Sequence, residues 1–304
     1  MRITGLHFLL TYQCIYECDH CFVWGSPRQT GVMTIEQIRG YLRQARDVKT
    51  VDWIYFEGGE PFLYYPVLMR GVQLATSMGF HVGIVSNAYW ATSRNDALTW
   101  LKPFVDMVED LSISCDQYHD CDEENPAAKN ALAAAEQLGI PVGLIKIAQP
   151  ENLPAARSEG QLPNGESGVM FRGRAACKLA DRVKQQSWTK FDGCLSEDLR
   201  EPGRVHVDPF GNIHICQGIV IGNISVKSLQ QICEEFKPDS HPVIGPLLSK
   251  GPTGLVKQYD LPHHKTYADA CHLCYRAREF LRAEFPELLG PDEMYGDEPG
   301  AESR

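Results

Sequence analysis

Apolar residues in the first half of the chain follow two different periods. Short runs rich in β-branched and aromatic residues are separated by longer segments in which apolar positions recur every three or four residues. This alternation is typical of βα units around a parallel sheet. The predicted strands cover residues 6–11, 53–57, 81–86, 111–115 and 142–147. The pattern therefore predicts an α/β fold in which four βα units are followed by a fifth strand.

The segments between these strands carry the local signals of helix ends. Thr34 followed by Gln37 predicts a capping box at the start of a helix over residues 35–45. Gly79 and Gly139 each follow a helical pattern, and glycine favours the left-handed conformation that ends a helix. We therefore expect helices between the strands, packed on the sheet.

The pattern changes after residue 150. Residues 150–167 are rich in Pro, Gly, Glu and Asn and lack an apolar period, which is typical of a linker. Two alternating runs on either side of residues 208–212 then predict a β-hairpin, and helices are predicted over residues 226–236 and 274–285. The chain is thus expected to contain a second, smaller unit behind the βα units.

The net charge and the apolar content of the chain limit the kinds of molecule that it can bind. The 304-residue chain has a formal net charge of −10, which argues against a nucleic acid or an anionic membrane as its main partner. No segment reaches the roughly 18 continuous apolar residues of a membrane span, and the N-terminal apolar run lacks a signal-peptide cleavage site. We therefore expect a cytoplasmic protein that acts on a small molecule or a peptide. The first predicted strand begins so early that we expect no separate N-terminal domain for peptide recognition.

The eleven cysteines are more typical of metal ligands than of a disulfide framework, because the expected compartment is reducing. Cys14, Cys18 and Cys21 directly follow the first predicted strand, at the edge of the sheet where barrel-like α/β folds form active sites. Three close thiolates without a fourth indicate an iron–sulfur cluster with one open iron. A structural zinc site is the alternative.

The sequence Gly58-Gly59-Glu60-Pro61 follows the second predicted strand, at the same edge as the three cysteines. Neither glycine carries a Cβ, so the backbone there can approach a ligand closely. Together the two motifs resemble the radical S-adenosylmethionine (SAM) superfamily, whose members carry a CxxxCxxC loop after the first strand and a GGEP-like motif after the second. This resemblance implies a partial (β/α)6 TIM-like barrel.

The resemblance also implies cofactors and chemistry. The three cysteines would ligate three irons of a [4Fe-4S] cluster, and SAM would chelate the fourth. An electron from a flavodoxin- or ferredoxin-type donor would then cleave SAM to methionine and a 5′-deoxyadenosyl radical, which abstracts hydrogen from the substrate. The residues implied in SAM binding are Gly58, Gly59, Glu60, Pro61, Ser86, Asn87 and His20. Ser86 and Asn87 would equally suit a strand-to-helix turn.

Asp116 and His119 follow the fourth strand and are expected to line the same cavity, unless they are ordinary polar loop residues.

Cys194, Cys216, Cys271 and Cys274 form a second set, with Gly211 five residues before Cys216. This spacing resembles the auxiliary-cluster domains called SPASM and twitch, and the lack of a further cysteine series after Cys274 favours twitch. The resemblance implies a second [4Fe-4S] cluster, fully ligated and suited to electron transfer. A zinc ribbon is the alternative, because four thiolates also satisfy zinc.

Three parts of the chain are expected on this basis. A radical SAM core barrel would cover residues 1–175, and a SPASM/twitch-like auxiliary domain would cover residues 176–290. Residues 291–304 are acidic and rich in Gly and Pro, which predicts a disordered tail.

Three kinds of function remain open from the sequence. The first is an oxidoreductase, similar to a dehydrogenase, that passes an electron from the substrate to the auxiliary cluster. The second is a radical SAM epimerase or a peptide-modifying enzyme of RiPP maturation, in which Cys115 or Cys177 returns a hydrogen atom. Cys115 would also suit plain packing in a strand, and Cys177 would suit an auxiliary-cluster ligand. The third is a non-catalytic iron–sulfur electron carrier or a zinc-binding protein.

Overall fold

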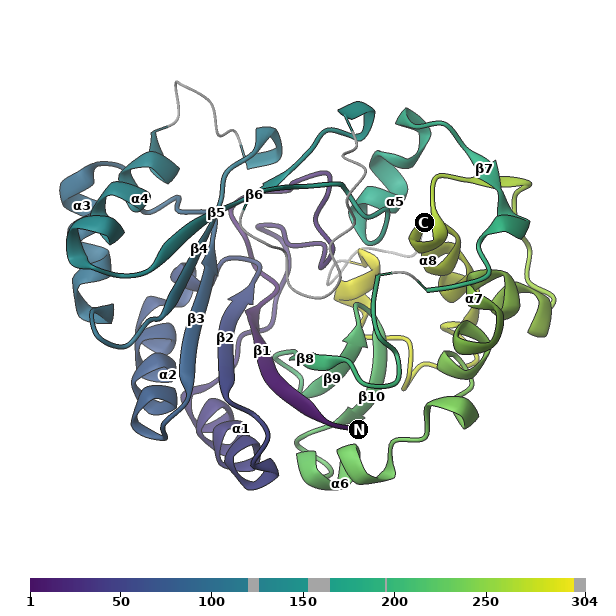
Figure 1. The fold of residues 1–304 in the computed structure, drawn as a ribbon, viewed down its shortest axis with the longest axis horizontal. Coiled ribbons are helices and arrows are strands. Elements are labelled where there is room, and N and C mark those ends of the chain that lie inside the picture. The colour runs from purple at the N-terminus through teal and green to yellow at the C-terminus, as the bar shows by residue number, and fades with distance from the viewer. Residues whose placement is uncertain (120–125, 153–164, 195, 298–304) are drawn as a thin grey trace.

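The computed structural model describes residues 1–119, 126–152, 165–194 and 196–297. Its main feature is a nine-stranded sheet with the strand order β10-β9-β8-β1-β2-β3-β4-β5-β6 (Figure 1). The strands are β1 (Ile3–Thr11), β2 (Trp53–Gly58), β3 (His81–Ser86), β4 (Asp110–Ser114), β5 (Val142–Ile147), β6 (Gly165–Ser167), β8 (Gly203–Val207), β9 (Asn212–Cys216) and β10 (Ile219–Asn223). Strands β1 to β6 pair in parallel in chain order. The predicted α/β fold with a partial barrel is therefore confirmed.

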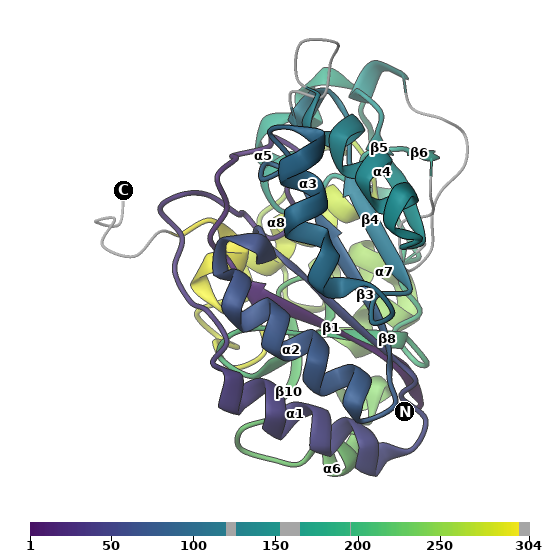
Figure 2. The same cartoon turned by 90° about the vertical axis from the view of Figure 1, so that its left-hand side faces the viewer.

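Four helices pack on the outer face of this parallel sheet, as Figure 2 shows. They are α1 (Ile35–Val48), α2 (Tyr65–Ser77), α3 (Arg94–Leu101) and α4 (Ala127–Leu138). The capping box predicted at Thr34 and Gln37 is present. Alternate residues of β1, namely Leu6, Phe8 and Leu10, are fully buried in the core that these helices form with the sheet. Because side chains alternate along a strand, the residues between them face the inside of the barrel.

Strand β8 joins the sheet from a distant part of the chain. It pairs in parallel with β1, and β9 and β10 continue the sheet in antiparallel pairs, which confirms the predicted hairpin around residues 208–212. The sheet thus contains strands from both sides of the domain boundary predicted between residues 175 and 176. The physical reason is that β1 would otherwise present an unpaired edge of N–H and C=O groups.

The C-terminal part places further helices beside the barrel. They are α5 (Arg174–Lys178), α6 (Leu229–Glu235), α7 (Ile244–Gln258) and α8 (Ala270–Leu281), and β7 (Gln186–Ser187) pairs with β11 (Thr266–Tyr267). Helix α8 begins four residues before the predicted start at 274, because the Asp269 side chain accepts a hydrogen bond from His272 N at 2.7 Å. Helix α7 was not predicted from the sequence, since Gly251 and Pro252 interrupt its pattern and kink it.

The described end of the chain is ordered. The segment Asp292–Tyr295 forms a 3-10 turn, and Met294 and Tyr295 are buried within it. The Tyr295 hydroxyl donates a hydrogen bond to Gly218 O at 2.9 Å. The prediction of a disordered tail is therefore wrong for residues 291–297, because these two large side chains dock the segment despite its polar composition. Residues 298–304 lie outside the described part.

Candidate active site

The three N-terminal cysteines lie together on the loop that follows β1. Cys14, Cys18 and Cys21 line one cavity at the carboxyl ends of the parallel strands, and all three are free thiols. Cys14 Sγ accepts a hydrogen bond from Asn87 Nδ2 at 3.5 Å, and Cys21 Sγ accepts one from Gly25 N at 3.2 Å. The structure thus brings the predicted triplet together, with polar N–H groups directed at its sulfur atoms.

Arg174 holds this loop in place. Its guanidinium donates hydrogen bonds to Cys18 O at 2.9 Å and to Gly25 O at 2.8 Å, and its backbone N–H donates to Cys21 O at 2.9 Å. The neighbouring Gly173 has a φ of +58°, and a Cβ there would lie 2.7 Å from Cys21 O. Arg174 belongs to an Arg-Gly-Arg stretch that precedes Cys177, and no local pattern in the sequence indicated its contact with the cysteine loop.

Gly58 and Gly59 line the same cavity. A Cβ on Gly58 would lie 2.4 Å from Thr11 O, and one on Gly59 would lie 2.1 Å from Gln13 O. Gly59 N also donates a hydrogen bond to Thr11 O at 2.7 Å. Both glycines face the cavity. They are required because the motif packs closely against the backbone that leads into the cysteine loop.

Glu60 is fully buried and joins the ends of β2 and β3. Its carboxylate accepts hydrogen bonds from Ser86 Oγ at 2.9 Å, Asn87 N at 2.8 Å and Phe62 N at 3.0 Å. Burial raises the pKa of Glu60 to about 7, against the effect of these hydrogen bonds. Ser86 and Asn87 line the cavity, whereas Glu60 and Pro61 are not among its described lining residues. Glu60 thus positions two residues of the cavity wall.

His20, Asp116 and His119 lie together in another part of the cavity wall. His119 Nδ1 lies 2.8 Å from Asp116 Oδ1, and Asp116 Oδ2 accepts a hydrogen bond from Ile147 N at 3.0 Å. Burial raises the pKa of Asp116, but the contacts with His119, His20 and the Ile147 N–H together lower it by more, so the net shift is downward. The His20 ring lies 4.5 Å from the Tyr118 ring, and burial lowers the pKa of His20 to about 3. His20 therefore presents a neutral aromatic ring.

The four predicted auxiliary cysteines line a second cavity. Cys216 ends β9, and Cys271 and Cys274 lie near the start of α8, so the fold brings them to Cys194 from distant parts of the chain. All four are free thiols. Burial raises the pKa of Cys274 to about 12. A thiolate at this position therefore needs additional positive charge nearby. A bound metal would supply that charge.

Arg172 lies between the two cavities and lines both. Its Nη1 atom lies 3.0 Å from Glu197 Oε1 and 3.5 Å from Cys216 Sγ. The side chain is buried, so Glu197 balances its charge within the protein. No sequence pattern indicated this position, because the two cavities meet only through long-range packing.

The two cysteines predicted as hydrogen donors lie elsewhere. Cys177 is exposed in α5, and neither it nor Cys115 is among the described residues that line the first cavity. Cys115 is disulfide-bonded, so its sulfur carries no hydrogen atom in this state. The structure does not bring either sulfur into the cavity.

The first cavity fits an iron–sulfur cluster with an open iron. Three free thiols on one loop supply soft sulfur ligands. Burial raises the pKa of Cys14 to about 12, so thiolate formation there requires a bound cation. The same cavity is lined by Gly59, Asn87 and Asp116, which leaves polar groups for a further ligand beside the thiols.

Comparison with known proteins identifies the family. Residues 8–146 match the model of the Radical SAM superfamily, and the chain belongs to this superfamily. Membership implies a [4Fe-4S] cluster and SAM as cofactors. The chain is 31% identical over 287 residues to the putative peptide biosynthesis protein YydG of Bacillus subtilis (strain 168), which covers 87% of this chain and 89% of YydG.

Two further matches are more distant. The S-adenosylmethionine-dependent nucleotide dehydratase of Fibrobacter sp. (strain UWH6) is 22% identical over 120 residues, or 37% of this chain and 34% of that protein. The crystal structure of BtrN in complex with AdoMet and 2-DOIA superimposes with a TM-score of 0.52 at 16% identity, over 77% of this chain and 83% of BtrN. At this identity BtrN supports the fold alone. In the described part of the chain, no helix has the length and apolar character needed to cross a membrane.

Proposed function

We propose that this protein is a radical SAM enzyme that modifies a peptide by a redox-linked reaction. The observation that carries the proposal is the cavity in which Cys14, Cys18 and Cys21 lie beside Asn87 and Asp116. The peptide substrate is supported by the near full-length similarity to YydG, a putative peptide biosynthesis protein. A small-molecule substrate remains the alternative that the experiments below must exclude.

In this proposal the three cysteines hold the [4Fe-4S] cluster, and Ser86, Asn87, His20 and Asp116 contact SAM. When bound, the two cofactors supply a carbon radical that removes a hydrogen atom from the substrate. Arg174 keeps the cysteine loop in one conformation, and Glu60 keeps the ends of β2 and β3 together. The protein thus orients the cofactors in a site whose walls are buried or partly buried, where competing reactions with water are limited.

We further infer that Cys194, Cys216, Cys271 and Cys274 hold an auxiliary [4Fe-4S] cluster that accepts an electron. The oxidised substrate would lose one hydrogen atom to the carbon radical, one electron to this cluster and one proton to solvent. Support comes from the cavity that all four thiols line and from Arg172, which lines both cavities. A flavodoxin- or ferredoxin-type protein would supply the electron that starts each reaction.

The first experiment tests the enzyme class. Protein reconstituted anaerobically with iron and sulfide is given SAM and dithionite, and 5′-deoxyadenosine is measured by chromatography. The wild type is expected to form it, and Cys18→Ala is expected to form none. Absence of 5′-deoxyadenosine from fully reconstituted wild type would contradict the proposal.

A second experiment tests the reaction on the peptide. Short peptides encoded beside the gene for this chain are incubated with the reconstituted enzyme in deuterated water and analysed by mass spectrometry. We expect a product that has lost two hydrogen atoms and carries no new carbon-bound deuterium. Deuterium incorporated at a stereocentre without net oxidation would instead demonstrate epimerisation, and the redox-linked reaction would be wrong.

A further inference from the structure

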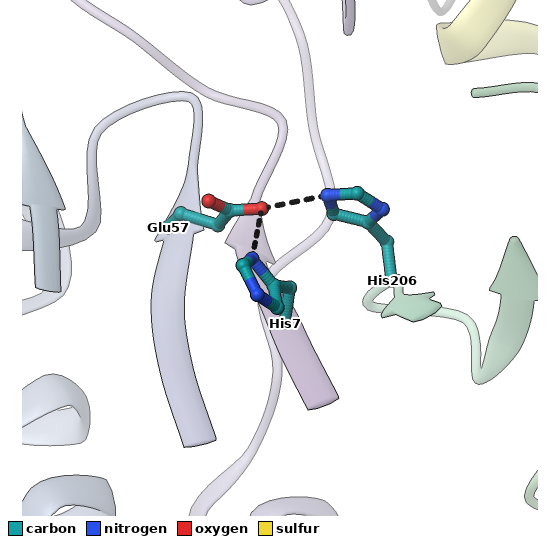
Figure 3. Close-up of side chains that lie close together, drawn as sticks. All are labelled: His7, Glu57 and His206. Carbon is teal, nitrogen blue, oxygen red and sulfur yellow. Dashed lines mark ion pairs between the residues drawn. The ribbon is translucent and has the colours of Figure 1, made fainter. Parts of the chain in front are cut away.

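A buried cluster of two histidines and one glutamate lies on the inner face of the sheet. His7 comes from β1, Glu57 from β2 and His206 from β8, and Figure 3 shows both imidazoles turned toward the same carboxylate oxygen. His7 and His206 face each other across the β1–β8 pairing. Each occupies a strand position between residues that pack outward, such as Leu6 and Val205. All three side chains therefore project into the barrel.

The three donor atoms converge at close range. Glu57 Oε1 lies 2.9 Å from His206 Nε2 and 3.3 Å from His7 Nδ1, and all three atoms lie within 4.8 Å of one another. Within the residues that the structure describes, His7 Nδ1 and Glu57 Oε1 have no partner that meets hydrogen-bond geometry. Well-aligned hydrogen bonds therefore do not account for the close approach of His7 Nδ1 to Glu57 Oε1.

The two distances from Glu57 Oε1, 2.9 Å and 3.3 Å, match the spacing of atoms in a metal coordination sphere. Ligand atoms bound about 2.1 Å from one metal ion lie about 3.0 to 3.4 Å apart at right-angled or tetrahedral geometry. Two imidazole nitrogens and one carboxylate oxygen, with other positions open, form a donor set that binds divalent first-row transition metals. All three residues line the first cavity, so a bound ion would have its open positions on that side.

The charges around Glu57 also suit a cation. In the described part of the chain, the ion pairs of Glu57 are made with His7 and His206 only, whereas the nearby Arg204 pairs with Glu197 at 3.5 Å. A divalent ion bound by the three side chains would place positive charge directly beside this buried carboxylate.

A second group of similar composition does not share these features. His119 and Asp116 are hydrogen-bonded to each other at 2.8 Å, and the other oxygen of Asp116 accepts the N–H of Ile147. His119 Nδ1 and both oxygens of Asp116 therefore already have protein partners, whereas Nδ1 of His20, the third member of this group, has none among the described residues. The Asp116 carboxylate thus has hydrogen-bond partners on both oxygens, whereas Glu57 Oε1 has none that meets hydrogen-bond geometry in the described part of the chain.

We propose that His7, Glu57 and His206 form a mononuclear site for a divalent first-row transition metal, separate from the two cysteine sets. The ion would be held by His7 Nδ1, Glu57 Oε1 and His206 Nε2 and would be open to the first cavity. The site does not depend on which substrate the enzyme modifies. Its occupancy can therefore be measured independently of the peptide reaction.

Manganese(II) is the probe for the test, because thiolates favour softer metals and the cysteines of the reconstituted holoenzyme are occupied. Anaerobic holoenzyme is titrated with Mn²⁺, and free Mn²⁺ is followed by its electron paramagnetic resonance signal. The wild type is expected to bind one Mn²⁺ per chain. Glu57→Gln and His206→Ala are expected to weaken binding by about tenfold or more. Iron content and thermal unfolding show whether each variant has folded and kept its clusters.

The matched control is His81→Ala. His81 and Glu109 form an exposed pair at 2.8 Å on the surface, so its loss is expected to leave Mn²⁺ binding unchanged. Pulsed spectra of Mn²⁺ bound to the wild type are expected to show nitrogen couplings from two imidazoles. The proposal is overturned if the wild type binds no stoichiometric Mn²⁺, if Glu57→Gln binds it equally well, or if the spectra lack imidazole nitrogen.

Discussion

At the scale of single residues, Arg174 contacts the cysteine loop at several backbone oxygens. Its buried guanidinium pairs with the carbonyl oxygens of Cys18 and Gly25. In Arg174→Met both acceptors would stay buried without their charged donor. We expect a loss of about 3 kcal/mol in the free energy of unfolding and a lower iron content after reconstitution, measured by denaturation and metal analysis.

Arg182 is the matched control for this prediction. It pairs with Glu151 at 2.8 Å, but both side chains are largely exposed. An exposed ion pair contributes little to stability, so Arg182→Met should retain the stability and iron content of the wild type. Equal behaviour of the two variants would show that Arg174 does not hold the loop.

Gly59 is a second residue where local geometry limits the choice of side chain. A Cβ there would lie 2.1 Å from Gln13 O, which is backbone and cannot rotate away. Gly59→Ala should therefore displace the cysteine loop and abolish cluster assembly, seen as loss of the visible absorption of iron–sulfur protein. Gly40→Ala, in α1 with no atom within 4 Å of the added Cβ, should instead stabilise the fold by about 0.5–1 kcal/mol. Normal cluster assembly in Gly59→Ala would contradict this account.

Glu60 predicts a dependence of stability on pH. Its pKa is raised from 4.5 to about 7 in the fold, so the folded state keeps a proton that the unfolded chain has already lost. The contribution of protonated Glu60 to the free energy of unfolding is fully present below the pKa of Glu60 in the unfolded chain. It is lost as the pH rises through the higher pKa of Glu60 in the folded protein. Compared with Glu60→Gln, the wild type should lose on the order of 3 kcal/mol of unfolding free energy across this range. The free energy of unfolding of both holoenzymes is measured by denaturation at a series of pH values. If it changes with pH in the same way for the wild type and Glu60→Gln, Glu60 does not titrate as expected.

At the scale of elements, the start of α8 positions half of the auxiliary site. Asp269 caps the helix, and the first turns place Cys271 and Cys274 at the second cavity. Reconstituted wild type should contain about eight iron atoms per chain, and Cys274→Ala should contain about four. The variant should still form 5′-deoxyadenosine, because the first cavity is unchanged. About four iron atoms with one zinc in the wild type would mean that the second site is a zinc site.

At the scale of the whole molecule, the two sequence regions depend on each other. Strand β8 covers the edge of β1, and Arg172 connects the two cavities. A chain that ends at residue 175 would expose the β1 edge, which is a template for aggregation. We expect this truncated chain to be insoluble or aggregated in gel filtration, whereas the full chain is not. A soluble, folded monomer from residues 1–175 would show that the barrel is an independent domain.

The amino-acid sequence by itself determined most of the local structure and the main chemistry. Strands β1 to β5 and helix α1 follow from apolar periods and from capping residues, which act over a few neighbouring positions, whereas β6 lies in a segment that was predicted to be a linker. The cysteine triplet and the Gly58-Gly59 motif are each contiguous in the chain, and parallel strands bring their carboxyl ends to one edge. These features were therefore predictable without coordinates.

Only the tertiary structure decided which distant residues meet. The pairing of β8 with β1 brings His206 to His7, and the contact of Arg174 with Cys18 depends on packing between segments far apart in the chain. The burial of Tyr295 against Gly218 likewise overrides the polar composition of its segment. Periodicity and spacing report the environment along one segment, whereas these contacts depend on the register between segments and on the space left between them.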